Sequence, residues 1–153
     1  MDISMDVLCD TLLHISEVKA GLEKICSELK LRGLIHDSTK LQEPEFSSFV
    51  STRPRFKQVN YGTPEYQKLT DEIKPAIDHH YENNRHHTVF FKNGINDMNL
   101  IDILEMISDW KAAERRSPDK KLIDTLGYAY KKYGISEQLA EIITNTLHYL
   151  NWI

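Results

Sequence analysis

The sequence places histidines and acids where they could bind a metal ion together. His36 and Asp37 are adjacent in "LIHDSTK" (residues 34–40), and Asp109 lies on a later segment. Imidazole nitrogens and carboxylate oxygens suit first-row divalent metals such as Mn, Fe, Co, Ni or Zn. Adjacent side chains on a helix diverge by about 100°, so both can reach an ion between their directions. Further ligands must come from other helices, and His14 and Asp109 are placed to supply them.

Four further residues with suitable chemistry follow in a short stretch. The apolar face of residues 69–77 continues to His80, which predicts that this imidazole points inward. "NRHH" then places Arg85, His86 and His87 in the loop just beyond. Six of the seven histidines therefore fall in three clusters, each in or beside a helical face expected to point inward.

Structural interpretations of the same residues stay open. A lone histidine on an apolar row, as His14 is beside Val18, is more often a core residue bonded to a backbone carbonyl. Asp102, Glu105 and Asp109 share one side of a helix and can equally form a solvated acidic stripe. Against this second interpretation, two alanines directly follow the stripe and let another segment approach closely.

Apolar residues recur every three or four positions along the chain, and no segment alternates convincingly as a strand does. The spacing predicts an all-α, single-domain bundle of about six or seven helices over residues 1–153. The segments 51–62 and 83–97 are expected to be loops. The expected helices are 4–27, 29–40, one opening at Pro44, 63–83 (which Pro75 can kink), 99–115, one from Ser117-Pro118 to about Gly134, and a last one capped by Ser136.

The bulk composition is that of an ordinary globular chain. Hydrophobic residues are 41% and charged residues 27% of 153, and the net charge is −4. No coat of basic residues for duplex nucleic acid is expected, although a local basic pocket could hold a small phosphate compound. The two cysteines, Cys9 and Cys26, are expected to be buried in a reducing cytoplasm. No apolar run approaches the ~18 residues that span a bilayer, and the acidic start lacks a secretory signal, so a cytosolic protein is expected.

The ordered set of these residues resembles the HD superfamily of metal-dependent phosphohydrolases. That signature is a histidine on an early helix, an adjacent His-Asp pair and a later aspartate, matched here by "LLHISEV", "LIHDSTK" and "ISDWKAA". "HDSTK" is also similar to the HD-x-x-K form of the HD-GYP branch, and "AIDHHYENN" to its HHE segment with the glutamate one residue late. "NRHH" replaces the G-Y-P segment itself. Over residues 14–116 the chain is also similar to a family of small HD-like proteins of phages and bacteria.

The resemblance implies an all-α HD bundle that hydrolyses a phosphate ester or anhydride with one or two divalent ions. It implies that Lys40 and Arg85 hold phosphate, one as a point charge and one as a bidentate fork, and that Glu45 assists as a base from outside the ligand set. A second group of histidines would complete a second metal site or donate to phosphate: His80, His86 and His87. The first ligands it implies are His14, His36, Asp37 and Asp109.

The leading functional hypothesis is hydrolysis of a nucleotide or similarly small phosphorylated metabolite. The alternative is a non-hydrolytic nucleotide-binding or sequestering protein that keeps the metal pocket. A third possibility uses two irons for oxygen chemistry. The apolar C-terminal "HYLNWI" suggests a packing or homodimer surface, although His148 and Trp152 would equally finish the core.

Overall fold

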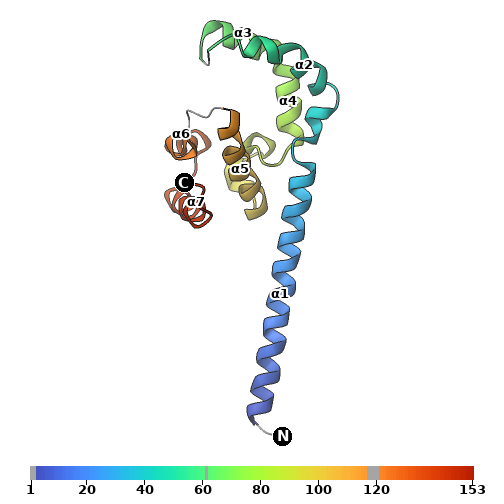
Figure 1. The fold of residues 1–153 in the computed structure, drawn as a ribbon, viewed down its shortest axis with the longest axis vertical. Helices are drawn as coiled ribbons and strands as arrows, with labels where there is room; N and C mark the ends of the chain where they lie inside the picture. The colour runs from blue at the N-terminus through green and yellow to red at the C-terminus, as the bar shows by residue number, and fades with distance from the viewer. Residues whose placement is uncertain (1–2, 61, 117–120) are drawn as a thin grey trace. The chain divides into compact units, whose positions relative to one another are not determined.

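The structure, a computed structural model, describes residues 3–60, 62–116 and 121–153. Within these ranges the chain forms seven α-helices joined by 3-10 turns and loops, without a strand (Figure 1). The predicted all-α class is thereby confirmed. The predicted helix start at Ser117-Pro118 lies outside the described residues. The helices are α1 (Ile3–Ile35), α2 (Glu45–Phe56), α3 (Pro64–Glu72), α4 (Lys74–Asn83), α5 (Leu100–Ala113), α6 (Leu122–Tyr133) and α7 (Glu137–Tyr149).

The chain divides into two compact units, Met1–Ile35 and His36–Ile153. The first unit is α1, one continuous helix without the predicted break near residue 28. The predicted helix 29–40 is wrong at its end, because Asp37 adopts the left-handed conformation with φ 57° and a 3-10 turn, Ser38–Leu41, follows. A left-handed residue cannot continue a right-handed helix. The His-Asp pair therefore stands at a helix end and not within a helix.

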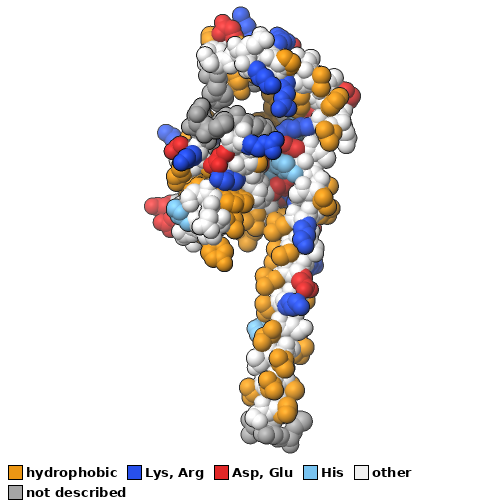
Figure 2. Space-filling model, in the orientation of Figure 1, with side chains coloured by type: hydrophobic (Ala, Val, Ile, Leu, Met, Phe, Trp, Pro, Cys, Tyr) orange, Lys and Arg blue, Asp and Glu red, His pale blue; other side chains and the backbone are white. Residues whose placement is uncertain are grey.

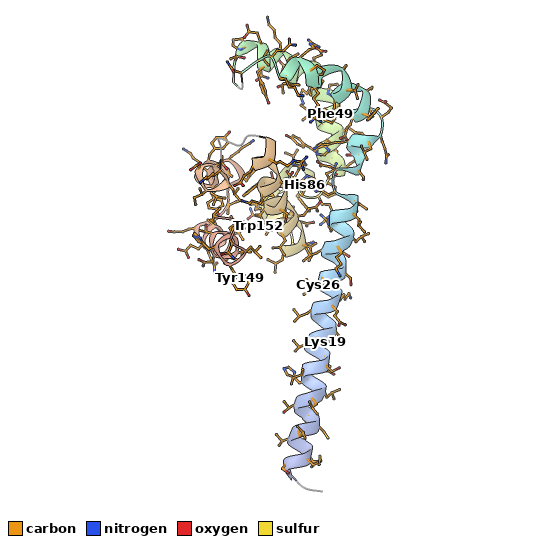
Figure 3. All side chains as sticks on the ribbon, viewed as in Figure 1. Lys19, Cys26, Phe49, His86, Tyr149 and Trp152 are labelled. Atoms are coloured by element: carbon orange, nitrogen blue, oxygen red, sulfur yellow. The ribbon has the colours of Figure 1, made fainter. Side chains whose placement is uncertain are left out.

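Taken by itself, α1 exposes apolar side chains along its length (Figure 2). Cys9 and Cys26 are exposed on it, so their predicted burial is wrong; Cys26 is labelled in Figure 3. A single helix that forms its own unit cannot bury its own side chains. His14, expected to face inward, is likewise exposed on this helix.

In the second unit, α5, α6 and α7 enclose a hydrophobic core. Apolar residues at helical spacing on α5 pack against Leu126 of α6 and Leu147 of α7, and Leu147 is completely buried. Burial of such a side chain stabilises the fold by about 1.5–3 kcal/mol. Trp152 packs against this core after α7, whereas Tyr149 is exposed (Figure 3). The C-terminal segment therefore does contribute to the core.

Helices α2, α3 and α4 pack together beside the turn Ser38–Leu41. Thr63 caps α3 by accepting a hydrogen bond from the backbone N–H of Tyr66, as the sequence predicts. The predicted single helix 63–83 is divided at Ile73, two residues before Pro75, which cannot donate a helical hydrogen bond. Contrary to prediction, α2 continues into residues 51–56 with Pro54 inside it, because the buried Thr52 anchors this stretch.

No helix within the described residues combines the length and the apolar character that crossing a membrane requires.

Candidate metal centre

The candidate centre lies within the second unit and is assembled from four segments. The turn after α1 supplies His36 and Asp37, and α4 supplies His80. The loop between α4 and α5 supplies His86, which Figure 3 labels, and His87. Helix α5 supplies carboxylates from the face that adjoins its apolar residues. The helical spacing of the sequence thus brings its imidazoles and acids together although up to about 70 residues separate them.

Local hydrogen bonds fix these segments. The amide of Asn84 donates to the Thr39 hydroxyl at 2.8 Å and to the backbone carbonyl of His80 at 2.7 Å. This ties the end of α4 to the turn that carries Asp37. The guanidinium of Arg85 holds the following loop on α5, with Nε 3.0 Å and Nη2 2.8 Å from the Asp102 carboxylate.

The carboxylate of Asp37 is the geometric centre of the cluster. Its Oδ1 lies 3.3 Å from His80 Nε2 and 3.6 Å from His86 Nε2. Its Oδ2 lies 3.6 Å from His36 Nε2. Across the cluster, His87 Nε2 lies 2.9 Å from His80 Nε2. Donor atoms at these separations surround a common space of the size that one metal–ligand shell requires.

Two buried polar atoms in this cluster have no hydrogen-bond partner among the described residues: Asp37 Oδ1 and His86 Nε2. Burial of an unsatisfied polar atom costs free energy, so such atoms call for an explanation such as an ion. Both are good donors to a transition metal. The centre therefore has two unsatisfied donor atoms at the point where its imidazoles converge.

Three overlapping sets of side chains offer ligand atoms that all lie within 4.8 Å of one another. Asp37 belongs to two of these sets, and each of its two carboxylate oxygens faces the histidines of one set. The sets are Asp37, His80, His86 and His87; His36, Asp37 and Asp109; and His36, His86 and Glu105.

Two glutamates stand behind the imidazoles, one completely buried and one largely buried. Glu45 of α2 is completely buried and accepts hydrogen bonds from His79 Nδ1 at 2.8 Å and His80 Nδ1 at 2.9 Å. Glu105 of α5 lies 2.8 Å from His36 Nδ1 through its Oε1. An ionised carboxylate can only accept, so the imidazole Nδ1–H donates in each pair, and the Nε2 atoms of His36 and His80 face Asp37.

The charges of the centre shift the ionisation of its groups in opposite directions. Pairing with Asp109 and with Glu105 raises the pKa of His36 to about 9. Burial, with the neighbouring His86 and His80, lowers the pKa of His87 to about 3. Strongly shifted and mutually dependent pKa values in one cluster are typical of functional sites.

The two aspartates of the centre are held in their ionised form. Burial raises the pKa of Asp37, but the nearby His80 imidazole and the Lys40 ammonium outweigh it and lower the pKa well below its usual range. Burial also raises the pKa of Asp109, and the hydrogen bond of His36 reverses this, so that the net shift is downward. Binding to a metal requires a deprotonated carboxylate, and the lowered pKa of each aspartate favours that form.

Six of the predicted ligands come together in this cluster, whereas the remaining predicted residues have other surroundings. Lys40 places Nζ 2.5 Å from Asp37 Oδ2 at the edge of the centre. Glu45 lies behind the histidines, and Arg85 is engaged with Asp102. His14 lies on α1, in the other unit, and its role as a ligand stays a prediction. The six are His36, Asp37, His80, His86, His87 and Asp109.

The predicted site residues do not include Glu105 or His79. The sequence places Glu105 in an acidic stripe with Asp109, four residues later on α5. The available signal was that stripe itself, together with the two alanines that allow close approach beside it. For His79, adjacent to His80, the sequence carries no signal that it shares a buried carboxylate.

An all-α chain whose imidazoles and carboxylates converge in this way belongs to the class of helical proteins with a candidate divalent-metal centre. The family comparison adds the particular assignment: the chain belongs to DUF5662, a family of unknown function, whose model matches residues 4–149. No curated protein and no solved structure matches the chain.

Proposed function

We propose that the protein is a metal-dependent phosphohydrolase that acts on a nucleotide or another small phosphorylated metabolite. The observation that supports it best is the pair of buried, unpartnered atoms, Asp37 Oδ1 and His86 Nε2, at the convergence of the imidazoles. A cation between them would satisfy both. The mixed nitrogen and oxygen donor set suits one or two ions of Mn, Fe, Co, Ni or Zn.

The chemistry that such an ion supplies when bound is a lowered pKa of its water and polarisation of the phosphoryl oxygens. Asp37 and the imidazoles of His80 and His86 would hold it from the protein interior. Partial exposure of His36, Asp109 and Lys40 leaves the outer side of the centre accessible to a substrate. An open coordination position on that side is what distinguishes a catalytic from a structural site.

Lys40 is the best candidate to attract a phosphate group. Its ammonium stands beside Asp37 at the accessible edge of the centre. Arg85, the other predicted phosphate ligand, already donates two hydrogen bonds to Asp102 and lies 4.9 Å from the centroid of the Phe91 ring. Glu45 uses both oxygens on His79 and His80, so its contribution is to orient these imidazoles.

The test compares metal content and phosphate release in the wild type and Asp37→Asn. Asparagine is preferred to alanine because it tolerates the left-handed backbone at φ 57°. Asp78→Asn is the matched control, since Asp78 is an acid of α4 paired with Lys74 on the surface. We expect the control to keep the metal and the wild-type rate, and Asp37→Asn to lose most of both.

Each outcome points to a different conclusion. Phosphate release that survives Asp37→Asn unchanged in pure protein would refute the assignment of this centre. Stable metal and saturable nucleotide binding without any product would favour the sequestering protein. No metal in the wild type after soaking with manganese or cobalt would reduce the histidines to structural residues.

A further inference from the structure

We propose that Glu105 is a positioning residue that fixes His36 and His86 with their Nε2 atoms toward the ion. Its Oε1 lies 2.8 Å from His36 Nδ1 and 3.3 Å from His86 Nδ1. One largely buried carboxylate oxygen thereby faces two imidazoles from separate segments of the chain. The inference rests on the metal centre of the proposed function and is independent of whether that centre hydrolyses phosphate.

The two nitrogens of each ring face opposite sides. On the Nδ1 side stands Glu105. On the Nε2 side, His86 faces Asp37 Oδ1 at 3.6 Å, and these are the two buried atoms without a partner. The Nε2 side is therefore where an ion would bind, and Glu105 would lie behind the rings and outside the ligand set.

The two nitrogens of His36 also face different acids, and one face of α5 supplies an acid to each of them. Its Nδ1 is on Glu105, while its Nε2 faces Asp109 Oδ1 at 3.7 Å and Asp37 Oδ2 at 3.6 Å. Glu105 and Asp109 are four residues apart on α5, so their side chains are neighbours on one face. One turn of helix thus supplies an acid to each nitrogen of the same imidazole, one to orient it and one to share the ion.

A second glutamate repeats the arrangement. Glu45 accepts from His80 Nδ1, and His80 Nε2 lies 3.3 Å from Asp37 Oδ1. Imidazole ligands of metals commonly donate their other N–H to a carboxylate, which fixes the tautomer and strengthens the ligand. Three imidazoles of the centre therefore turn their Nε2 atoms toward Asp37, and each has a glutamate on its Nδ1 side.

Loss of this carboxylate would affect both rings at once. The His36 and His86 rings lie in contact, with centroids 4.4 Å apart, so neither can rotate without disturbing the other. Outer hydrogen-bond partners of metal ligands typically change metal affinity by about 10- to 100-fold. Since Glu105 serves two ligands, we expect an effect at the upper end of that range.

The test is Glu105→Gln, which keeps the size and one acceptor oxygen but removes the charge. Metal stoichiometry and affinity are measured with Co²⁺, whose absorption spectrum reports the ligand geometry. Glu82→Gln, at an exposed acid of α4, is the matched control for loss of one negative charge. We expect Glu105→Gln to keep the full metal count, to bind about 10- to 100-fold more weakly and to change the spectrum, while the control matches the wild type.

Two results would overturn the inference. Loss of a whole metal equivalent in Glu105→Gln would make Glu105 a ligand, and an affinity equal to that of the control would deny it any role at the centre. If the wild type itself binds no metal, the proposed centre fails and the inference fails with it. A wild type that binds metal, beside an unaffected variant, removes the inference alone.

A measurement on the unsubstituted protein covers the case in which Glu105→Gln does not fold. Nitrogen-15 NMR of the Zn²⁺-loaded wild type distinguishes a protonated from a metal-bound ring nitrogen. We expect a proton on Nδ1 and the metal on Nε2 for both His36 and His86. Metal on Nδ1 of either ring would overturn the assignment.

Discussion

The ion pair of Arg85 with Asp102 attaches the loop that carries His86 and His87 to α5, and its removal gives the sharpest test of that attachment. Asp102 is completely buried and receives both a bidentate guanidinium and the backbone N–H of Asn99 at 3.1 Å. It thereby caps α5 and anchors the loop that begins at Arg85. Removal of Arg85 takes two charge-assisted hydrogen bonds from a carboxylate that cannot reach bulk water.

Removing one partner of a fully buried ion pair costs about 3–5 kcal/mol. The side chain of Arg85 is 40% exposed, so water can enter part of the vacated space. We therefore expect Arg85→Ala to lower the free energy of unfolding by about 2–3 kcal/mol. For a chain of 153 residues this corresponds to a fall in Tm of about 4–12 °C.

The assay is urea unfolding of wild type and Arg85→Ala in a chelator, so that loss of metal does not contribute to the difference. Arg55→Ala is the matched control, because Arg55 forms a 2.6 Å ion pair with Glu72 in which both side chains are about half exposed. Exposed pairs contribute little, so its unfolding midpoint should equal that of the wild type. Equal midpoints for Arg85→Ala and Arg55→Ala would refute the reasoning.

Two further predictions concern the same unfolding measurement. The metal-free protein should be most stable near pH 6.5. The pKa of His36, raised to about 9, stabilises the fold below pH 6.5, and this contribution is lost as the pH rises toward 9. The pKa of His87, lowered to about 3, stabilises the fold above pH 6.5, and this contribution is lost as the pH falls toward 3. A midpoint that rises steadily from pH 6.5 to 9 would contradict the shift assigned to His36. Leu147→Ala should lower the free energy of unfolding by about 2–5 kcal/mol, because Leu147 is completely buried in the core; an unchanged midpoint would place it at the surface.

Helix periodicity and capping residues were sufficient to predict the all-α class and several helix ends. Thr63 and Ser136 do cap α3 and α7, and Gly134 ends α6 with φ 65°. The errors lie where tertiary contacts, and not local propensity, determine where a helix begins or ends. Pro54 lies inside α2, whose Glu45 and Thr52 side chains are buried. Local propensity cannot register this burial.

The candidate ligands were predictable because their residue types are unusual on inward faces. The orienting carboxylates were not, because periodicity cannot tell a buried acid from a solvated one on the same helix face. Glu105 and Asp109 share one face and differ only in what packs against them. Which nitrogen of an imidazole faces the centre depends on that packing, which brings together residues 69 positions apart, as with His36 and Glu105.

The opposite pKa shifts of two imidazoles in the centre follow from where its acids lie. His36 stands between Glu105 and Asp109 and therefore holds a proton near neutral pH. His87 is buried beside other imidazoles and therefore stays neutral. In the metal-free protein the proton of His36 and the ammonium of Lys40 supply the positive charge that the carboxylates require. An incoming cation must displace that proton, so apparent metal affinity should increase about tenfold per pH unit up to about pH 9, where His36 loses its proton unaided. Competition with a metal indicator at several pH values measures this slope, and an affinity independent of pH would show that His36 is not a ligand.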